Sequence, residues 1–198
     1  MSELEELRAR LISVVREDGY ERRSEPFRLS SGGTSHDYVD GKRAVATSER
    51  LRLLGEVVHG ICREEGVEFE AVGGMTMGAD PIALAVVMTA PAGKDVSWFS
   101  VRKEPKGHGT GQSVEGPPLR TGTKVLLVDD VVTTGRSITK ALDAIEPRSV
   151  EVVLAVPLVD RGDLAGAELA HRGVRCHPVM TYEDLGIDPV EAVESFQR

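Results

Sequence analysis

The residues best suited to chemistry lie within 124–142. A continuous apolar run there ends in two adjacent carboxylates, Asp129 and Asp130, and a polar turn leads from them into a helical pattern. The first N–H groups of a helix have no partner inside it, so this turn favours a bound phosphate. The turn also supplies hydroxyl donors and a glycine that allows close approach of the backbone: Thr133, Thr134, Ser137 and Gly135. Because the carboxylates would repel the same phosphate, we expect them to face ribose hydroxyls, directly or through a metal.

The segment from Val125 to Ser137 resembles the ribose-5-phosphate loop of the type I phosphoribosyltransferases, which bind 5-phosphoribosyl 1-diphosphate (PRPP). A Walker-type ATP site is excluded, because the sequence has no G-x-x-x-x-G-K-[ST]. The resemblance implies a PRPP-binding set in this loop: Asp129, Asp130, Val131, Val132, Thr133, Thr134, Gly135, Arg136 and Ser137.

A second segment, 102–116, concentrates positive charge in an otherwise acidic chain. Its cations are Arg102, Lys103, Lys106 and His108, and its glycines are too frequent for a regular element, which is typical of a functional loop. The pattern Arg-Lys-Glu-x-Lys-x-His-Gly resembles that of orotate phosphoribosyltransferases. The resemblance implies that the four cations bind PRPP, that Lys103, Lys106 and His108 are catalytic, and that 102–116 is a mobile lid reaching the neighbouring subunit.

Residues 26–40 are predicted to form two short strands joined by a turn rich in serine and glycine. The pattern Phe-x-Leu-x-Ser-Gly resembles the hood segment of orotate phosphoribosyltransferases, which implies that Tyr38 and Val39 contact orotate. Many members carry lysine where this chain has Ser30. A substitute cation is then needed, and Lys42 and Arg43 are the nearby candidates.

A glycine-rich loop at 74–78 is expected between a strand at 69–73 and a helix at 81–90, with Asp80 as N-cap and Pro81 as the first helical residue. By resemblance this loop takes the diphosphate of PRPP. Relatives sometimes carry a lysine where Gly78 stands, so backbone N–H groups must do more of the binding here.

A further apolar strand at 150–157 precedes Arg161. Ligands of open parallel sheets bind beyond the carboxyl ends of the strands, the side where Asp129 and Asp130 are expected. In the resembling family an arginine in this position pairs with the carboxylate of orotate, which gives an expected orotate-binding set of Tyr38, Val39, Thr133 and Arg161.

The composition limits the partners. The 198 residues carry a formal charge of −8, with 40% hydrophobic residues, and the calculated pI is about 5.2. This acidity argues against nonspecific binding of nucleic acid or an anionic membrane. Cys62 and Cys176 have no zinc or disulfide spacing, and no apolar run suits a signal peptide or a membrane span. We expect a cytoplasmic protein.

The remaining patterns complete an α/β prediction. Helices are expected at 2–18, with a Ser2–Glu5 capping box, at 47–65, at 163–172 and at 189–197, and strands at 96–101, 124–129 and 174–179. Strands alternating with helices predict a Rossmann-like, mostly parallel sheet covered on both faces. We expect one domain over 1–198, with a small hood formed by about 20–45 and the C-terminal region.

Together the motifs favour an Mg²⁺-dependent orotate phosphoribosyltransferase that forms orotidine 5′-phosphate and diphosphate in the synthesis of UMP. By resemblance, Mg²⁺ is held mainly by oxygens of PRPP, with help from Asp129. The resemblance also implies that two subunits share their active sites. The next reaction is expected to belong to another chain. The alternatives are a purine or other pyrimidine phosphoribosyltransferase, and a PRPP-sensing regulator without catalysis.

Overall fold

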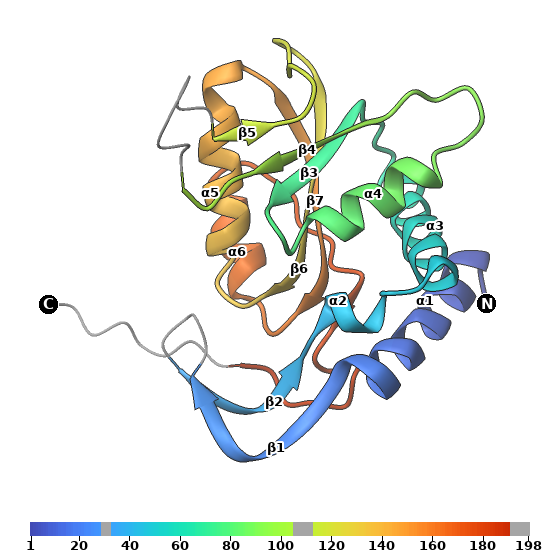
Figure 1. The fold of residues 1–198 in the computed structure, drawn as a ribbon, viewed down its shortest axis with the longest axis vertical. Helices are drawn as coiled ribbons and strands as arrows, with labels where there is room; N and C mark the ends of the chain where they lie inside the picture. The colour runs from blue at the N-terminus through green and yellow to red at the C-terminus, as the bar shows by residue number, and fades with distance from the viewer. Residues whose placement is uncertain (29–32, 105–112, 191–198) are drawn as a thin grey trace, which may run out of the picture.

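A six-stranded sheet forms the centre of the protein in a computed structural model that describes residues 1–28, 33–104 and 113–190 (Figure 1). All neighbouring strands are parallel except β4 and β5, which confirms the predicted mostly parallel sheet. In spatial order the strands are β5 (Val114–Glu115), β4 (Ser97–Val101), β3 (Ala71–Met75), β6 (Lys124–Val132), β7 (Glu151–Asp160) and β8 (Met180–Thr181).

Helices cover both faces of this sheet (Figure 1). The helical elements are α1 (Glu3–Val14) with a following π-helical turn (Val15–Gly19), α2 (Gly41–Ala44), α3 (Ser48–Glu64), α4 (Asp80–Met88), α5 (Arg136–Ile145) with a 3-10 turn (Glu146–Arg148), and α6 (Leu164–His171). Buried side chains of α1, α3 and α4 form one hydrophobic cluster with the sheet, and those of α5 and α6 form another.

Strand β6 contributes to both clusters. Leu126 and Val128 pack with α1, α3 and α4, whereas Val125 and Leu127 pack with α5 and α6. Successive side chains of a strand point to opposite faces, so an unbroken apolar run is what a strand covered on both sides requires. The two carboxylates near the end of β6 are therefore carried by a strand that is buried on both faces.

The predicted helix starts are found for α1 and α3. Glu5 N–H donates to Ser2 Oγ at 3.2 Å, and Ser2 N–H donates to Glu5 Oε2 at 2.6 Å, which completes the capping box. Thr47 caps α3 by accepting from the backbone N–H of Arg50. Helix α1 ends in the π-helical turn that closes at Gly19.

A separate two-stranded antiparallel sheet precedes α2. Its strands are β1 (Tyr20–Arg28) and β2 (Thr34–Val39), and Figure 1 shows them beside the end of the main sheet where α2 also lies. The hydroxyl of Tyr182 donates to the backbone oxygen of Asp37 at 3.3 Å. The hairpin and the segment after β8 thus touch, in the region expected to form the hood.

Several predicted boundaries were wrong. Strand β3 is 71–75 rather than 69–73, because the predicted loop residues Gly74 and Met75 pair with β4 in the sheet. Ala79, not Asp80, is the N-cap of α4. Strands β6 and β7 run three residues further than predicted, since each continues its pairing with the other as far as Val132 and Asp160.

The strand predicted at 174–179 and the start of the helix predicted at 189–197 were also wrong. In place of a strand at 174–179 there is a single parallel bridge between Ala155 and Cys176, and β8 begins only at Met180. Residues 189–190 are not helical, and the rest of the predicted helix at 189–197 lies outside the described residues. Short edge segments carry few apolar residues, so their pattern predicts their ends poorly.

Candidate active site

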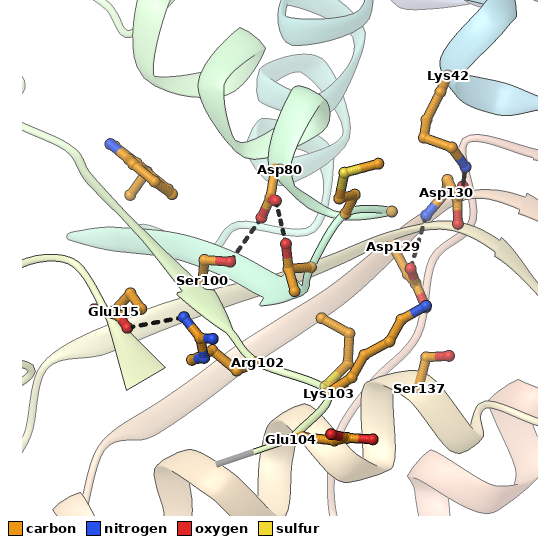
Figure 2. Close-up of a pocket in the computed structure, with 15 residues that line it drawn as sticks. Lys42, Asp80, Ser100, Arg102, Lys103, Glu104, Glu115, Asp129, Asp130 and Ser137 are labelled. Carbon is orange, nitrogen blue, oxygen red and sulfur yellow. Dashed lines mark hydrogen bonds and ion pairs between the residues drawn. The ribbon is translucent and has the colours of Figure 1, made fainter. Parts of the chain in front are cut away.

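A cleft of about 890 Å³ opens at the carboxyl ends of β3, β4 and β6, the edge at which open parallel sheets bind ligands. Figure 2 shows polar and charged side chains converging on it from these strands, from α2 and from the first turns of α4 and α5. The lining residues are Lys42, Met75, Thr76, Met77, Gly78, Asp80, Trp98, Ser100, Arg102, Lys103, Glu104, Glu115, Asp129, Asp130 and Ser137.

The acid pair of β6 lies on one wall of this cleft. Asp129 is only 4% exposed, and its Oδ1 accepts from the backbone N–H of Asp130 at 3.0 Å. Asp130 Oδ1 accepts from the N–H of Val131 at 2.9 Å. The second oxygen of Asp129, Oδ2, is buried and has no hydrogen-bond partner among the residues described here. It is an acceptor available to a ligand in the cleft.

The two carboxylates differ in their electrostatic surroundings. Burial, and next the negative charge of Asp130, raise the pKa of Asp129 to about 7. Lys42, on α2, forms a hydrogen-bonded ion pair with Asp130 (Figure 2). Burial alone would lower the pKa of Lys42, but the hydrogen bond and charge of Asp130 outweigh it and raise this pKa. Lys42 is therefore the cation that faces Asp130 in the cleft.

The turn between β3 and α4 forms the adjoining wall. A Cβ atom at Gly78 would lie 2.5 Å from Asp130 Oδ1 and 2.8 Å from Asp129 Oδ1, so the turn packs directly against the acids. The peptide bond between Thr76 and Met77 is cis. The turn contains no lysine or arginine, and a longer side chain at Gly78 would displace the acid pair.

The predicted phosphate turn leads into α5 through Gly135, the N-cap, whose φ of +70° suits glycine. No side chain caps this helix, so its first N–H groups point out of the helix without a capping oxygen. Thr133 is buried, and Ser137 lines the cleft. Thr134 and Arg136 instead line a separate depression between α5 and α6. Val131 and Val132 belong to β6.

Two of the predicted lid cations, Arg102 and Lys103, follow β4 and line the cleft. Arg102 Nη1 lies 3.4 Å from Glu115 Oε1, and Figure 2 shows Lys103 extending toward Asp129. Lys106 and His108 lie outside the described residues, as does most of the predicted lid at 102–116. Ser30 also lies outside them.

Arg161 and Tyr38 do not line the large cleft. Arg161 is 9% exposed and lines a second cleft, of about 440 Å³, with its Cζ 5.8 Å from the ring centroid of Tyr182. Its Nε has no hydrogen-bond partner in the described parts of the chain. Tyr38 packs edge-on against Phe27, under the guanidinium of Arg23, and Val39 is buried.

Sequence reasoning assigned no chemistry to Thr76 and Ser100, and treated Asp80 only as a helix cap. All three line the cleft, and both hydroxyls donate to the Asp80 carboxylate. The proximity of Ser100 depends on the pairing of β3 with β4, for which no local pattern exists. Nothing in the local sequence therefore indicated that Ser100 and Asp80 form a hydrogen bond.

The donor set of the cleft fits Mg²⁺ bound mainly by a substrate. The unpartnered Asp129 Oδ2 is a carboxylate oxygen, the ligand type that this ion prefers. No group of three or more His, Cys, Asp or Glu side chains that could hold a metal occurs in 1–28, 33–104 and 113–190. The protein would thus supply one oxygen, and phosphate and water oxygens would supply the others.

Comparisons with known proteins agree on one family. The model of the phosphoribosyl transferase domain matches residues 71–175. The orotate phosphoribosyltransferase of Rhodopirellula baltica is 38% identical over 187 residues, which cover 91% of this chain and 95% of the relative. The crystal structure of the Mycobacterium tuberculosis orotate phosphoribosyltransferase with PRPP is 34% identical, with a TM-score of 0.74 over 91% of this chain and 99% of that one. The Aeropyrum pernix orotate phosphoribosyltransferase structure is 32% identical, with a TM-score of 0.72 over 88% and 95%.

Within the described ranges, no helix has the length and apolar character needed to cross a membrane.

Proposed function

The chain belongs to the orotate phosphoribosyltransferases, and from that premise we propose that it transfers the 5-phosphoribosyl group of PRPP to N1 of orotate. The products are orotidine 5′-phosphate and diphosphate, and the reaction is a glycosyl transfer in the synthesis of UMP. The observation that carries the proposal is the cleft in which the acid pair, Ser137 at the start of α5, and the cations Arg102 and Lys103 face one another.

The chemistry requires charge control more than a strong base. Breaking the anomeric C–O bond of PRPP builds positive charge on the ribosyl ring and negative charge on the departing diphosphate. N1 of the orotate dianion is already nucleophilic, so no side chain has to abstract a proton first. The protein must position both reactants, neutralise the leaving group and exclude water from the ribosyl centre.

The cleft residues can be assigned to these tasks. Asp129 and Asp130 accept hydrogen bonds from the ribose 2′- and 3′-hydroxyls, and their charge stabilises the developing cation. The turn from Thr133 to Ser137 holds the 5′-phosphate at the N-terminus of α5. Arg102 and Lys103 bind the diphosphate, together with Lys106 and His108. Lys42, which lines the cleft beside Asp130, supplies the phosphate contact of the lysine that is absent at Ser30.

We assign orotate to Arg161 and Tyr38, with Val39 and Thr133 beside them. The buried guanidinium of Arg161 has an Nε without a partner in the described structure, which suits a bidentate contact with the orotate carboxylate. In the present structure this guanidinium rests near Tyr182.

Mg²⁺, when bound, supplies positive charge to the diphosphate oxygens of PRPP. On the protein side, Asp129 Oδ2, which has no partner among the described residues, would contact it. The reaction partners are otherwise small molecules, and we propose that the enzyme works in the cytoplasm.

We further propose a homodimer in which the lid of one copy serves the cleft of the other. Leu84 and Met88 are 42% and 83% exposed on one face of α4, next to the strand that bears the 37%-exposed Trp98, and apolar exposure of this kind suits a protein contact. Mixing Lys106→Ala chains with Asp129→Asn chains is expected to restore about a quarter of wild-type activity, through dimers with one intact site. Mixtures as inactive as either parent would contradict a shared site.

The decisive assay follows the loss of orotate absorbance with PRPP and Mg²⁺, with uracil, adenine and hypoxanthine as alternative acceptors. Orotate alone is expected to be consumed, and Asp129→Asn is the inactive control. Turnover of a purine without turnover of orotate would favour another phosphoribosyltransferase. Binding of PRPP without turnover of any base would favour a PRPP-sensing regulator.

A further inference from the structure

Asp80 forms the only described side-chain link between the β3–α4 turn and strand β4. Thr76 Oγ1 donates to Asp80 Oδ2 at 2.6 Å, and Ser100 Oγ donates to Asp80 Oδ1 at 2.8 Å (Figure 2). Each carboxylate oxygen thus accepts from one hydroxyl. Hydrogen bonds to an ionised acceptor are short and about twice as strong as those between neutral groups. The start of the turn, the start of α4 and the end of β4 are thereby held together.

The carboxylate does not serve as the cap of its own helix. Asp80 is the first residue of α4, where a negative charge favours the helix dipole, yet no side chain caps this helix. Both oxygens are directed to hydroxyls on the cleft wall instead. A residue needed only to begin α4 would have no reason to engage a serine on β4.

The turn fixed in this way packs against the acid pair. Gly78 lies two residues after Thr76 and two before Asp80, and a Cβ atom there would meet both Asp129 and Asp130 closer than 3.0 Å. Contact with the acid pair therefore limits movement of the turn toward β6, and the hydrogen bonds of Asp80 limit its movement relative to β4. Since the turn carries no cation, its contacts with an anion have to come from backbone N–H groups. Those of Thr76 and Ala79 already donate to the backbone oxygens of Val101 and Met75, so the contacts fall to Met77 and Gly78, whose aim depends on this fixed geometry.

We infer that Asp80 is a positioning residue that orients the 76–79 turn toward the diphosphate of PRPP through its hydrogen bonds with Thr76 and Ser100. The inference rests on the proposed function for the identity of the ligand. Asp80 does not touch the reacting atoms. Its two carboxylate oxygens accept hydrogen bonds from the hydroxyls of Thr76 and Ser100, and it acts through the backbone of the turn.

The test compares Asp80→Ala, which removes both bonds, with Asp80→Asn, which can keep both because its amide accepts from one hydroxyl and donates to the other. Asp80→Ala is expected to raise KM for PRPP at least tenfold while KM for orotate changes less than twofold. Asp80→Asn is expected to keep KM for PRPP within about threefold of wild type. Thr76→Val is expected to raise KM for PRPP by an intermediate factor. Thr89→Val is the matched control, since it removes a hydroxyl bond to Ala85 at the other end of α4.

Calorimetry with inorganic diphosphate and Mg²⁺ separates this inference from the proposed function, because it needs no turnover. Asp80→Ala is expected to weaken diphosphate binding at least tenfold, with the thermal midpoint close to that of Thr89→Val. Three results would overturn the inference: unchanged diphosphate affinity in Asp80→Ala, equal loss for orotate and PRPP together with a lower thermal midpoint, or an Asp80→Asn variant as impaired as Asp80→Ala. Failure of the wild-type protein to use orotate would contradict the proposed function only.

Discussion

At the scale of single residues, the site contains a buried carboxylate whose position is unfavourable for the stability of the fold. Asp129 is almost fully buried beside a second carboxylate, and one of its oxygens has no partner in the described structure. Such a group lowers stability unless a ligand satisfies it. Its neighbour Asp130 has the ion pair with Lys42 in compensation. The difference between the two acids follows first from the deeper burial of Asp129 and next from the ion pair of Asp130 with Lys42.

The raised pKa of Asp129 makes stability depend on pH. Because the folded pKa, about 7, exceeds the ordinary value of 3.8, the folded state binds the proton more tightly, and the group destabilises the fold increasingly as pH rises from about 4 to 7. Asp129→Asn should therefore raise the free energy of unfolding by roughly 1–3 kcal/mol at pH 8 and by far less at pH 4. Urea unfolding at both pH values measures this, and an equal effect at both would contradict it.

The same substitution should lower kcat/KM by roughly 100-fold, the usual effect of losing one preorganised electrostatic contact with the transition state. A variant that is more stable and less active would show that the buried charge is kept for function. Lys124→Gln, at the exposed start of β6, is the matched control and should change neither quantity measurably.

At the scale of elements, strand β6 and helix α5 carry the ribose and phosphate contacts, and Gly135 joins them. Its φ of +70° is unfavourable for other residues, and a Cβ atom there would lie 3.2 Å from the Cα of Ala165 on α6. The angle at which α5 leaves the sheet therefore depends on the absence of a side chain.

Gly135→Ala should accordingly lower the free energy of unfolding by about 1–2 kcal/mol and raise KM for PRPP several-fold by tilting the N-terminus of α5. Gly122→Ala is the matched control, because its φ is +80° but its Cβ would meet nothing within 4 Å. The control should lose about 1 kcal/mol of stability and keep its KM. Steady-state kinetics with PRPP as the varied substrate and thermal unfolding decide the matter, and equal kinetic effects in both variants would count against the role given to Gly135.

Elements with strong patterns could be predicted from the sequence, and those fixed by distant contacts could not. The heptad-like spacing and capping residues of α1 and α3, and the apolar runs of β6 and β7, are local signals. The bridge at Cys176 and the short β8 exist because they pair with β7, so their own residues say little. The acid pair, Ser137 and the cations after β4 were placed in one site by sequence. The hydrogen bonds of Asp80 depend on the pairing of β3 with β4, which no local pattern predicts. The position of the Arg161 guanidinium depends on its contact with Tyr182.

At the scale of the whole molecule, two clefts offer sites for ligands, and an exposed apolar face offers a contact surface for a second copy of the chain. The acid pair lies in the larger cleft and Arg161 in the smaller one. Met88, 83% exposed, is the last residue of α4, and Figure 1 shows this helix on the side of the sheet opposite α5 and α6. A second copy covering this face would bury it.

Met88→Asp should shift the proposed dimer toward monomers, because a carboxylate in an apolar contact loses its hydration without gaining a partner. Sedimentation velocity over a range of concentrations should show at least tenfold weaker association, and activity per chain should fall at low concentration. Glu64→Ala, at the exposed end of α3, serves as the surface control. A wild-type protein that is monomeric, or a Met88→Asp dimer of unchanged affinity, would exclude this face as the contact.

The double burial of β6 ties the active site to the cooperativity of the entire fold. Val125 and Leu127 belong to one hydrophobic cluster, and Leu126 and Val128 to the other, so this strand packs against both halves of the core. Amide protons of such a central strand exchange with solvent only when the molecule unfolds globally. The acids at its end therefore share the lifetime of the native state, and loss of the site and loss of the fold become a single event.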